Sequence, residues 1–322
     1  MACQSKDDAP TRPQIEGVEL TWLSTTNWLV RYDTTVILLD AFFTRPQLGV
    51  DGSKPEGIAR MKKMLEAVGS PEVDAILVGH SHYDHVIDAG AASLATGAQL
   101  YGSQTTCLIA QSQNLPPERC TVLKDGDQLS FGGVPIDVVR TIHWWPTTQG
   151  IGKFQELTEV PKANIASAGP NGGVLSFLFH FEQGGEPVTV FYQNTLGEMD
   201  ADDGSGEDYV ANLERTFANV DQTTVWLGCP DCTNDRAALD AYVNIIQPKW
   251  TIPHHWDGPM SDVESGVATP FVPMEIYTQS LEAAGSNMTV PTQYFEPYLL
   301  QNGTLSKATT APIRDAFNLS AQ

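Results

Sequence analysis

Short runs of β-branched and aromatic residues, separated by polar turns, recur along the chain. Several such runs lie between residues 18 and 43, and they predict antiparallel strands near the start. The segment 55–69 differs, because its apolar residues recur at the three- and four-residue spacing of a helix. These residues are Ile58, Met61, Leu65 and Val68, and a proline and a glycine stand at the two ends of the segment. The pattern predicts an amphipathic helix that covers a sheet.

Further apolar runs are predicted strands, and each of them leads directly into a polar residue. The runs are 73–79, 134–142, 187–193, 223–228 and 249–253, and they lead to His80, His143, Asn194, Cys229 and the pair His254 and His255. A second helix is predicted over 236–247. Because functional groups concentrate on loops that a rigid sheet holds, we expect these polar residues to converge at one sheet edge.

Two long segments, 146–173 and 257–273, show no clear periodicity. Loops of this length are usually functional lids or disordered segments. Both segments directly follow candidate metal ligands, which favours lids over a bound substrate. Neither a repeat nor a linker divides the chain, so we expect a single domain over 17–322 after a flexible tether over 1–16.

The composition narrows the choice of partners. With 39 acidic and 18 basic residues the formal net charge is −21, which repels the phosphate backbone and argues against nucleic-acid substrates. A small-molecule substrate is expected instead. An acidic, solvated surface also suits a salty or extracellular setting. No apolar run in the chain approaches the roughly 18 residues that cross a bilayer.

Cys3 stands after a small residue and before a polar stretch that contains two prolines. This order resembles the mature start of a bacterial lipoprotein, in which a lipid on Cys3 would be the means of membrane attachment. The alternative is an ordinary start with an incidental cysteine. The first interpretation predicts a periplasmic or extracellular protein.

The other cysteines fall in two pairs, Cys107 with Cys120 and Cys229 with Cys232. Both spacings permit disulfides in an oxidising compartment. The second pair also has the spacing of a redox or metal motif, but a single CxxC is a weak zinc signal. A structural disulfide or two free thiols remain the favoured alternatives there.

Three of the seven histidines lie within six consecutive residues. His80, His82, Asp84 and His85 offer imidazole and carboxylate ligands directly after a predicted buried strand. Neutral imidazole suits a borderline ion such as Zn²⁺, and carboxylates complete sites that leave a position open for water. Several partly cationic groups packed together without a metal would be costly. The cluster therefore predicts a metal site.

The run HSHYDH, from His80 to His85, resembles the His-x-His-x-Asp-His signature of the metallo-β-lactamase superfamily at every fixed position. The resemblance implies an α/β fold of the four-layer αββα sandwich type, as a single domain. It implies that Asp40 supports the metal loop by hydrogen bonding. It assigns His80, His82 and His143 to a first ion, and Asp84, His85 and a late histidine to a second, for which His255 is preferred and His254 is the alternative.

One position departs from that pattern. Where the family usually carries a bridging aspartate, this chain has Asn194, a neutral carbonyl donor. The site loses a negative charge, so a second ion is expected to bind weakly. Asp257 is then either a replacement ligand, a partner of a ligand, or a carboxylate that caps a turn.

Other residues near the candidate ligands carry weaker signals. His180 lies in an alternating run and is expected to pack or pair across strands. The aromatic residues beside the ligands either form the wall of an apolar substrate pocket or belong to the core; they are Tyr83, Trp144, Trp145 and Trp256.

These residues predict a metal-dependent hydrolase with one or two ions, most simply zinc. A zinc-bound hydroxide would attack an ester, lactone, amide or phosphodiester, with Asp84 and His255 as the catalytic residues. An iron-dependent oxidoreductase is an alternative on the same fold, but Asn194 argues against it. A non-catalytic metal-binding protein is the other alternative.

Overall fold

The computed structural model describes residues 12, 14–45, 52, 54–144, 152–162, 169–230, 236–261 and 263–308. Cys3, Trp145 and Cys232 lie outside these residues, as does nearly all of the predicted tether 1–16.

The strands of the described residues form two mixed sheets. The first has the order β15-β14-β1-β2-β3-β4-β5-β6. Its strands are β1 (Ile15–Ser24), β2 (Asn27–Asp33), β3 (Thr35–Leu39), β4 (Ala75–Leu77), β5 (Gln99–Gly102), β6 (Cys120–Val122), β14 (Glu296–Gln301) and β15 (Thr304–Lys307). Strands β3 to β6 run parallel and the rest pair antiparallel.

The second sheet has the order β13-β12-β11-β10-β9-β8-β7. Its strands are β7 (Gln128–Phe131), β8 (Val134–Thr141), β9 (Val174–Gln183), β10 (Glu186–Tyr192), β11 (Thr223–Gly228), β12 (Pro248–Pro253) and β13 (Asn287–Met288). Here β10 to β13 run parallel, while β7 to β10 pair antiparallel.

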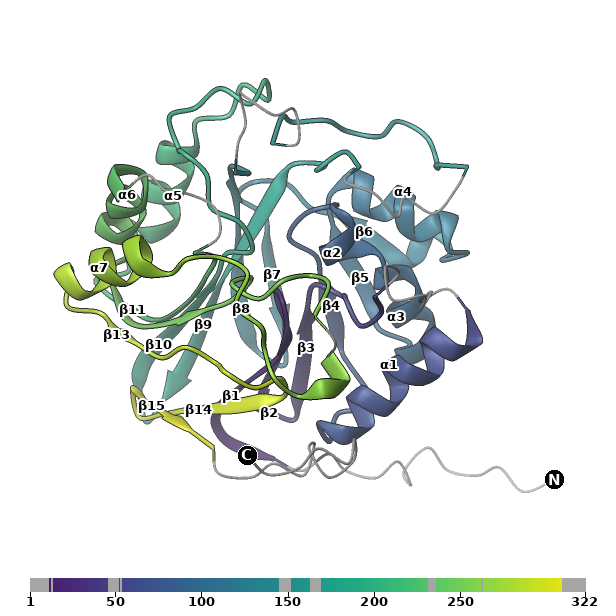
Figure 1. Cartoon of the computed structure of the whole chain (residues 1–322), viewed down its shortest axis with the longest axis horizontal. Coiled ribbons are helices and arrows are strands. Elements are labelled where there is room, and N and C mark those ends of the chain that lie inside the picture. Colours follow the sequence, from purple (N-terminus) through teal and green to yellow (C-terminus); the bar gives the residue numbers. More distant parts are fainter. Residues whose placement is uncertain are drawn as a thin grey trace.

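Helices cover the outer face of each sheet (Figure 1). Those against the first sheet are α1 (Pro55–Ala67), α2 (Tyr83–Val86), α3 (Ala89–Thr96) and α4 (Gln104–Ser112), and those against the second are α5 (Tyr209–Phe217), α6 (Arg236–Ile246) and α7 (Glu275–Ala283). Short 3-10 turns lie at Pro117–Arg119 and Val263–Ser265. The arrangement is the four-layer αββα sandwich expected from the sequence.

Two apolar cores hold these layers together. The larger lies between the sheets, where it includes the completely buried Trp22, Trp28 and Phe177, and it continues between the first sheet and helices α1, α3 and α4. The smaller lies between the second sheet and α5 to α7, with Trp226 and Leu239 among its residues. Burial at about 25 cal/mol per Å² of apolar surface is the main force that fixes the strand ends in place.

The elements expected from the periodicity are confirmed. The helix predicted over 55–69 is α1, and it buries Met61, Met64 and Leu65. The helix predicted over 236–247 is α6, and the runs that lead to polar residues are β4, β8, β10, β11 and β12. The strand over 73–79 is shorter than expected, because only Ala75–Leu77 pairs within the sheet.

A disulfide joins Cys107 on α4 to Cys120 at the start of β6. This is one of the two pairs that the cysteine spacing permitted. Of the other pair, Cys229 is buried at the end of β11, and its partner in the sequence is outside the described residues. No described helix is both long enough and apolar enough to cross a membrane.

Candidate metal centre

The candidate ligands reach one end of the sandwich from both sheets. His80 and His82 lie in the connection after β4, and Asp84 and His85 lie on the short helix α2 that follows it. From the second sheet, the connection after β8 contributes His143 and the one after β12 contributes His255. His80, His143 and His255 therefore converge as the sequence predicted, whereas Cys229, which the prediction also included, lies in the smaller core.

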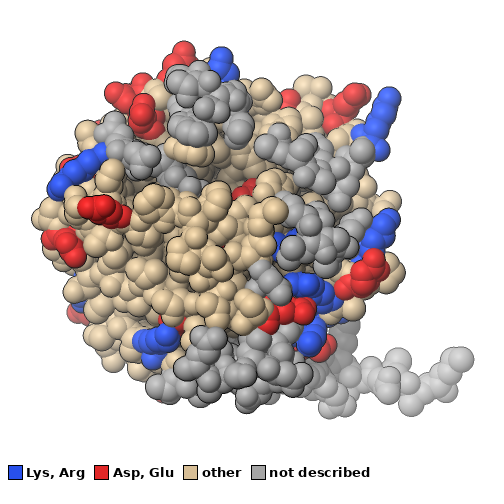
Figure 2. Space-filling model, viewed as in Figure 1, with Lys and Arg blue, Asp and Glu red and all other residues tan. Residues whose placement is uncertain are grey.

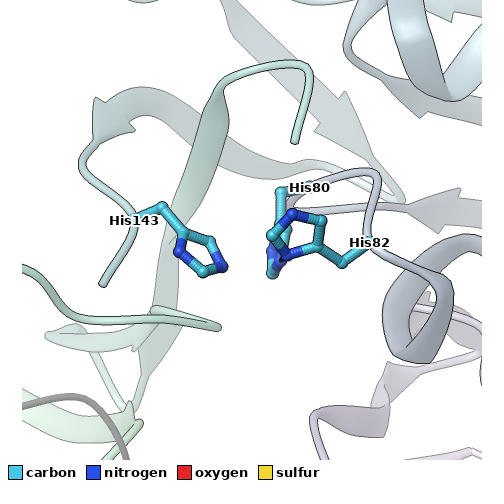
Figure 3. A group of neighbouring side chains, drawn as sticks. All are labelled: His80, His82 and His143. Atoms are coloured by element: carbon cyan, nitrogen blue, oxygen red, sulfur yellow. Dashed lines mark hydrogen bonds between the residues drawn. The ribbon is translucent and has the colours of Figure 1, made fainter. Parts of the chain in front are cut away.

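His80, His82 and His143 form a group that we call the first trio, in which one ligand atom of each lies within 4.8 Å of the others. Figure 3 shows their rings turned toward a common point, with His143 approaching from the opposite side. The Nε2 atom of His80 lies 3.0 Å from Nδ1 of His82. The Nδ1 atom of His143 donates to the Trp144 carbonyl oxygen at 2.7 Å, so its Nε2 keeps a lone pair for a ligand bond.

The first trio is neutral at ordinary pH. Burial lowers the pKa of His80 and His143 well below the usual value, and burial lowers that of His82 to about 4. The neighbouring imidazoles lower the pKa of all three further. Metal binding requires neutral imidazole, so the protein environment prepares these side chains for it.

Asp84, His85 and His255 form the second trio, again with ligand atoms within 4.8 Å of one another. Nε2 of His255 lies 3.3 Å from one carboxylate oxygen of Asp84, and Nε2 of His85 lies 3.8 Å from the other. Burial by itself would raise the pKa of Asp84, but the facing imidazoles hold that pKa below its ordinary value. The second trio thus has one carboxylate that stays ionised.

The two trios are adjacent, with the ring centroids of His80 and His85 only 3.8 Å apart. All six side chains are buried or nearly so.

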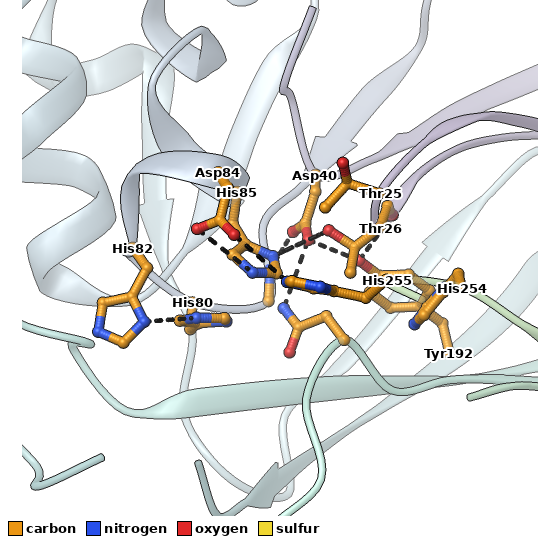
Figure 4. Close-up of polar contacts among 12 residues, drawn as sticks. Thr25, Thr26, Asp40, His80, His82, Asp84, His85, Tyr192, His254 and His255 are labelled. Atoms are coloured by element: carbon orange, nitrogen blue, oxygen red, sulfur yellow. Dashed lines mark hydrogen bonds and ion pairs between the residues drawn. The ribbon is translucent and has the colours of Figure 1, made fainter. Parts of the chain in front are cut away.

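Asp40 is the hydrogen-bonding centre behind the second trio (Figure 4). Its Oδ2 accepts from Nδ1 of His85 at 2.6 Å, from the Thr26 hydroxyl at 2.7 Å and from the Tyr192 hydroxyl at 2.6 Å. Its Oδ1 accepts from the Gly79 amide at 2.7 Å. A carboxylate on Nδ1 of His85 fixes the ring orientation and leaves Nε2 facing Asp84, the usual arrangement behind a metal-binding histidine.

Asn194 lies completely buried between Asp40 and Gly79. Its Nδ2 is 3.5 Å from Oδ2 of Asp40, and a Cβ at position 79 would come within 1.6 Å of that nitrogen. Glycine is therefore required at position 79. The amide oxygen of Asn194 has no hydrogen-bond partner among the described residues, so it is available to a ligand.

His254 and Asp257 lie beside the second trio but outside it. Nδ1 of His254 accepts from the Trp28 indole at 2.8 Å, so its Nε2 carries the proton that is donated to the Gln193 carbonyl at 2.8 Å. Neither nitrogen keeps a lone pair for a metal. The Oδ2 atom of Asp257 accepts from the Thr25 amide and the Tyr294 hydroxyl, which favours a supporting role for this carboxylate.

The remaining candidates are placed as follows. His180 pairs with Asp137 across β8 and β9 at 2.7 Å. Trp256 is buried and stacks on Trp22 in the core, while Trp144 is half-buried beside the smaller core and Tyr83 packs edge-on against Phe42. Of the two roles expected for these aromatic residues, Trp256 therefore has the one in the core.

The donor set fits zinc. Nε2 of His80 and Nδ1 of His82 are both possible lone-pair atoms at 3.0 Å, close to the roughly 3.3 Å that separates two nitrogens on a tetrahedral ion with bonds of about 2.0 Å. Five imidazoles with one or two oxygen donors are the ligands that a borderline ion prefers.

Residues 20–109, which include Asp40 and the cluster from His80 to His85, match the metallo-beta-lactamase superfamily. This part of the chain is therefore similar to members of that superfamily. A UPF0173 metal-dependent hydrolase of Anaeromyxobacter sp. (strain K) is 24% identical over 74% of both chains. One of Myxococcus xanthus is 30% identical over 42% of each chain.

Solved structures share the fold at low identity. The metallo hydrolase Igni18 from Ignicoccus hospitalis has a TM-score of 0.51 at 14% identity, and covers 91% of this chain and 99% of its own. The metallo-beta-lactamase fold protein YhfI from Bacillus subtilis has a TM-score of 0.52 at 11% identity, and the match covers 91% of this chain and 100% of YhfI. These structures confirm the fold that the sequence predicted.

Sequence reasoning missed three supporting residues: Thr25, Thr26 and Tyr192. The first two stand in a turn between predicted strands, where threonine is ordinary. Tyr192 ends a predicted strand, where an aromatic residue is ordinary. No local pattern distinguishes them, since their importance comes from contact with Asp40 and with residues 255–257.

Proposed function

We propose that this protein is a zinc-dependent hydrolase that cleaves an ester, lactone, amide or phosphodiester bond in a small molecule. The observation that carries the proposal is the convergence of the two adjacent trios from three connections, which follow β4, β8 and β12. Zinc held there would supply Lewis acidity, which activates water near neutral pH and polarises the bond to be cleaved.

The first trio would hold one ion through its three neutral imidazoles. The second trio would hold another, with the amide oxygen of Asn194 as a neutral additional donor. Because asparagine carries no charge where the family usually has an aspartate, we expect the second ion to bind more weakly than the first.

Asp84 and His255 are the residues that we assign to catalysis beside metal binding. The ionised carboxylate of Asp84 can orient a water molecule by accepting its hydrogen bond. Its lowered pKa makes Asp84 a weak proton acceptor, so orientation is its main role. His255, 3.3 Å from this carboxylate, can steady it or hold a proton during turnover.

The surface charge supports a small-molecule substrate rather than a nucleic acid. The net charge is −21, and on the face in Figure 2 the basic side chains lie near the rim rather than in one patch. We also propose a periplasmic or extracellular location, since the Cys107–Cys120 disulfide suits an oxidising compartment. A lipid on Cys3 would be the anchor there. To test this, the mass of the unchanged protein is compared with the mass of the Cys3→Ser variant made in the same cells, which cannot carry the lipid.

The test of the enzymatic proposal measures metal content and turnover in the same preparations. Zinc content is determined by mass spectrometry, and hydrolysis is followed on ester, lactone, amide and phosphodiester panels. We expect bound zinc and hydrolysis of at least one class, and we expect His82→Ala to lose both.

The matched control is His180→Ala, which removes an imidazole that pairs with Asp137 across two strands. It should keep the zinc content and turnover of the unchanged protein. Iron in place of zinc without hydrolysis would favour the oxidoreductase alternative, and bound metal without any turnover would favour a binding protein. Wild-type activity in His82→Ala would refute the proposed site.

A further inference from the structure

The two-residue turn Thr25–Thr26, between β1 and β2, lies against the second trio. Hairpin turns ordinarily lie at the surface, yet both threonines of this one are completely buried. Thr25 has a φ of +48°, in the left-handed region that a non-glycine residue adopts only when its surroundings hold it there. The burial and the strain show that this turn is tightly held.

Thr26 acts on His85 through its side chain. Its hydroxyl donates to Oδ2 of Asp40 at 2.7 Å and lies 2.9 Å from Nδ1 of His85, which donates to the same oxygen. The hydroxyl therefore fixes the carboxylate that fixes the imidazole. Without it, Asp40 would lose one of its short hydrogen bonds and His85 would lose a neighbour on one side of the ring.

Thr25 acts on His255 through its backbone. Its carbonyl oxygen accepts from the His255 amide at 3.0 Å and from the Trp22 indole at 2.9 Å. His255 itself has a φ of +62°, a conformation that costs a non-glycine residue about 1 kcal/mol or more. The hydrogen bond to Thr25 thus holds a strained backbone that aims His255 at Asp84.

Asp257 connects the turn to the loop after β12. Its Oδ2 accepts from the Thr25 amide at 3.2 Å and from the Tyr294 hydroxyl at 2.8 Å. Because Thr25 receives a hydrogen bond from residue 255 and gives one to residue 257, the turn and this loop are joined at two points. One oxygen of the carboxylate that the sequence offered as a ligand is thereby held by the turn, while its Oδ1 has no hydrogen-bond partner among the described residues.

We propose that the Thr25–Thr26 turn is a positioning element that sets the second metal position, because consecutive residues in it hold the two histidines of the second trio. The inference rests on the proposed zinc centre and adds the residues that hold the second trio in place. The first trio provides an internal reference, since the structure shows no hydrogen bond between it and the turn within the described residues.

The test is a zinc titration of the metal-free whole chain in competition with a chromophoric chelator, which yields a Kd for each ion. Thr26→Val keeps the β-branched shape and removes the hydroxyl. We expect it to weaken the second ion by roughly 10- to 100-fold, the usual effect of losing a partner of a metal ligand, and to leave the first ion unchanged. Thr26→Ser keeps the hydroxyl and should restore most of the affinity.

Thr251→Val is the matched control, because it removes another completely buried threonine hydroxyl, whose hydrogen bond goes to Ser286 at 3.0 Å and not to a residue of either trio. It should leave both Kd values unchanged even where it lowers the melting temperature. If Thr26→Val does not fold, Asp257→Asn is used instead, because it weakens the hydrogen bond to the Thr25 amide. We expect this variant to bind the second ion roughly tenfold more weakly.

The outcomes separate this inference from the proposed function. A Thr26→Val variant that binds the second ion as tightly as the unchanged protein overturns the inference, and so does one that weakens both ions equally. An unchanged protein that binds a single ion and hydrolyses its substrate also overturns it, while the hydrolase proposal stands. An unchanged protein that binds no zinc refutes the proposed centre itself.

Discussion

The two trios lie side by side, but the protein holds them in different ways. The donors of the first trio face one another, and the support that His143 receives is the backbone carbonyl of Trp144. The second trio is supported by side chains that come from distant parts of the sequence, with Asp40 at their centre. The first trio thus depends mainly on where the strands end, whereas the second trio depends on a hydrogen-bond network.

The largest effect is expected when a histidine of the first trio is removed. His143→Ala leaves two imidazoles for the first ion, so we expect turnover to fall by more than roughly 100-fold, beyond the usual cost of losing a supporting residue. His255→Ala should keep the first ion bound. Zinc content and kcat/KM of both variants measure the difference, and an equal loss of both ions in the two variants would show that the trios are not separable.

A smaller effect is expected from Asp40→Asn. The amide presents a donor to at least one of the groups that now donate to the carboxylate, so a buried group is left without an acceptor. We expect the second ion to weaken by roughly 10- to 100-fold and the free energy of unfolding to fall by about 1–3 kcal/mol. Zinc titration and urea denaturation measure the two quantities. If the first ion weakens as much as the second, Asp40 supports both trios.

Asn194→Asp should destabilise the protein in the absence of zinc and stabilise it in the presence of zinc. Without metal, the new carboxylate would face Asp40, whose oxygen is 3.5 Å from the present amide nitrogen, and repulsion on the order of 1–4 kcal/mol is expected. With zinc, the added charge should tighten the second ion. Melting temperatures with and without zinc test this, and a variant that is stabilised in both states would contradict it.

The smallest effect is a loss of stability of the metal-free protein in mild acid. Burial lowers the pKa of His82 to about 4 and that of His254 to about 3, from an ordinary 6.5, so the unfolded chain binds protons first as the pH falls. Stability is then fully present above about pH 6.5 and declines below it, by about 1 kcal/mol for each imidazole over the first pH unit.

Urea denaturation of metal-free protein at several pH values measures that decline. Stability that rises as the pH falls from about 6.5 to about 5.5 would refute the assignment of neutral imidazoles.

The sequence by itself determined the local part of this site. A buried strand that leads into HSHYDH places His80, His82, Asp84 and His85 within six residues, so their proximity needs no knowledge of the fold. Strand periodicity also indicated which loops carry His143, Asn194 and His255. Alternation and helical spacing are local properties, and burial enforces them in every strand and helix.

Only the tertiary structure decided which side chains surround these ligands and in what orientation. It separated His255 from His254, because both nitrogens of His254 are used by Trp28 and Gln193. It also gave Thr25, Thr26 and Tyr192 their supporting roles, and engaged Asp257 with the turn. Hydrogen bonds between residues more than 100 positions apart depend on how two sheets pack face to face, and no local pattern of residues records that packing.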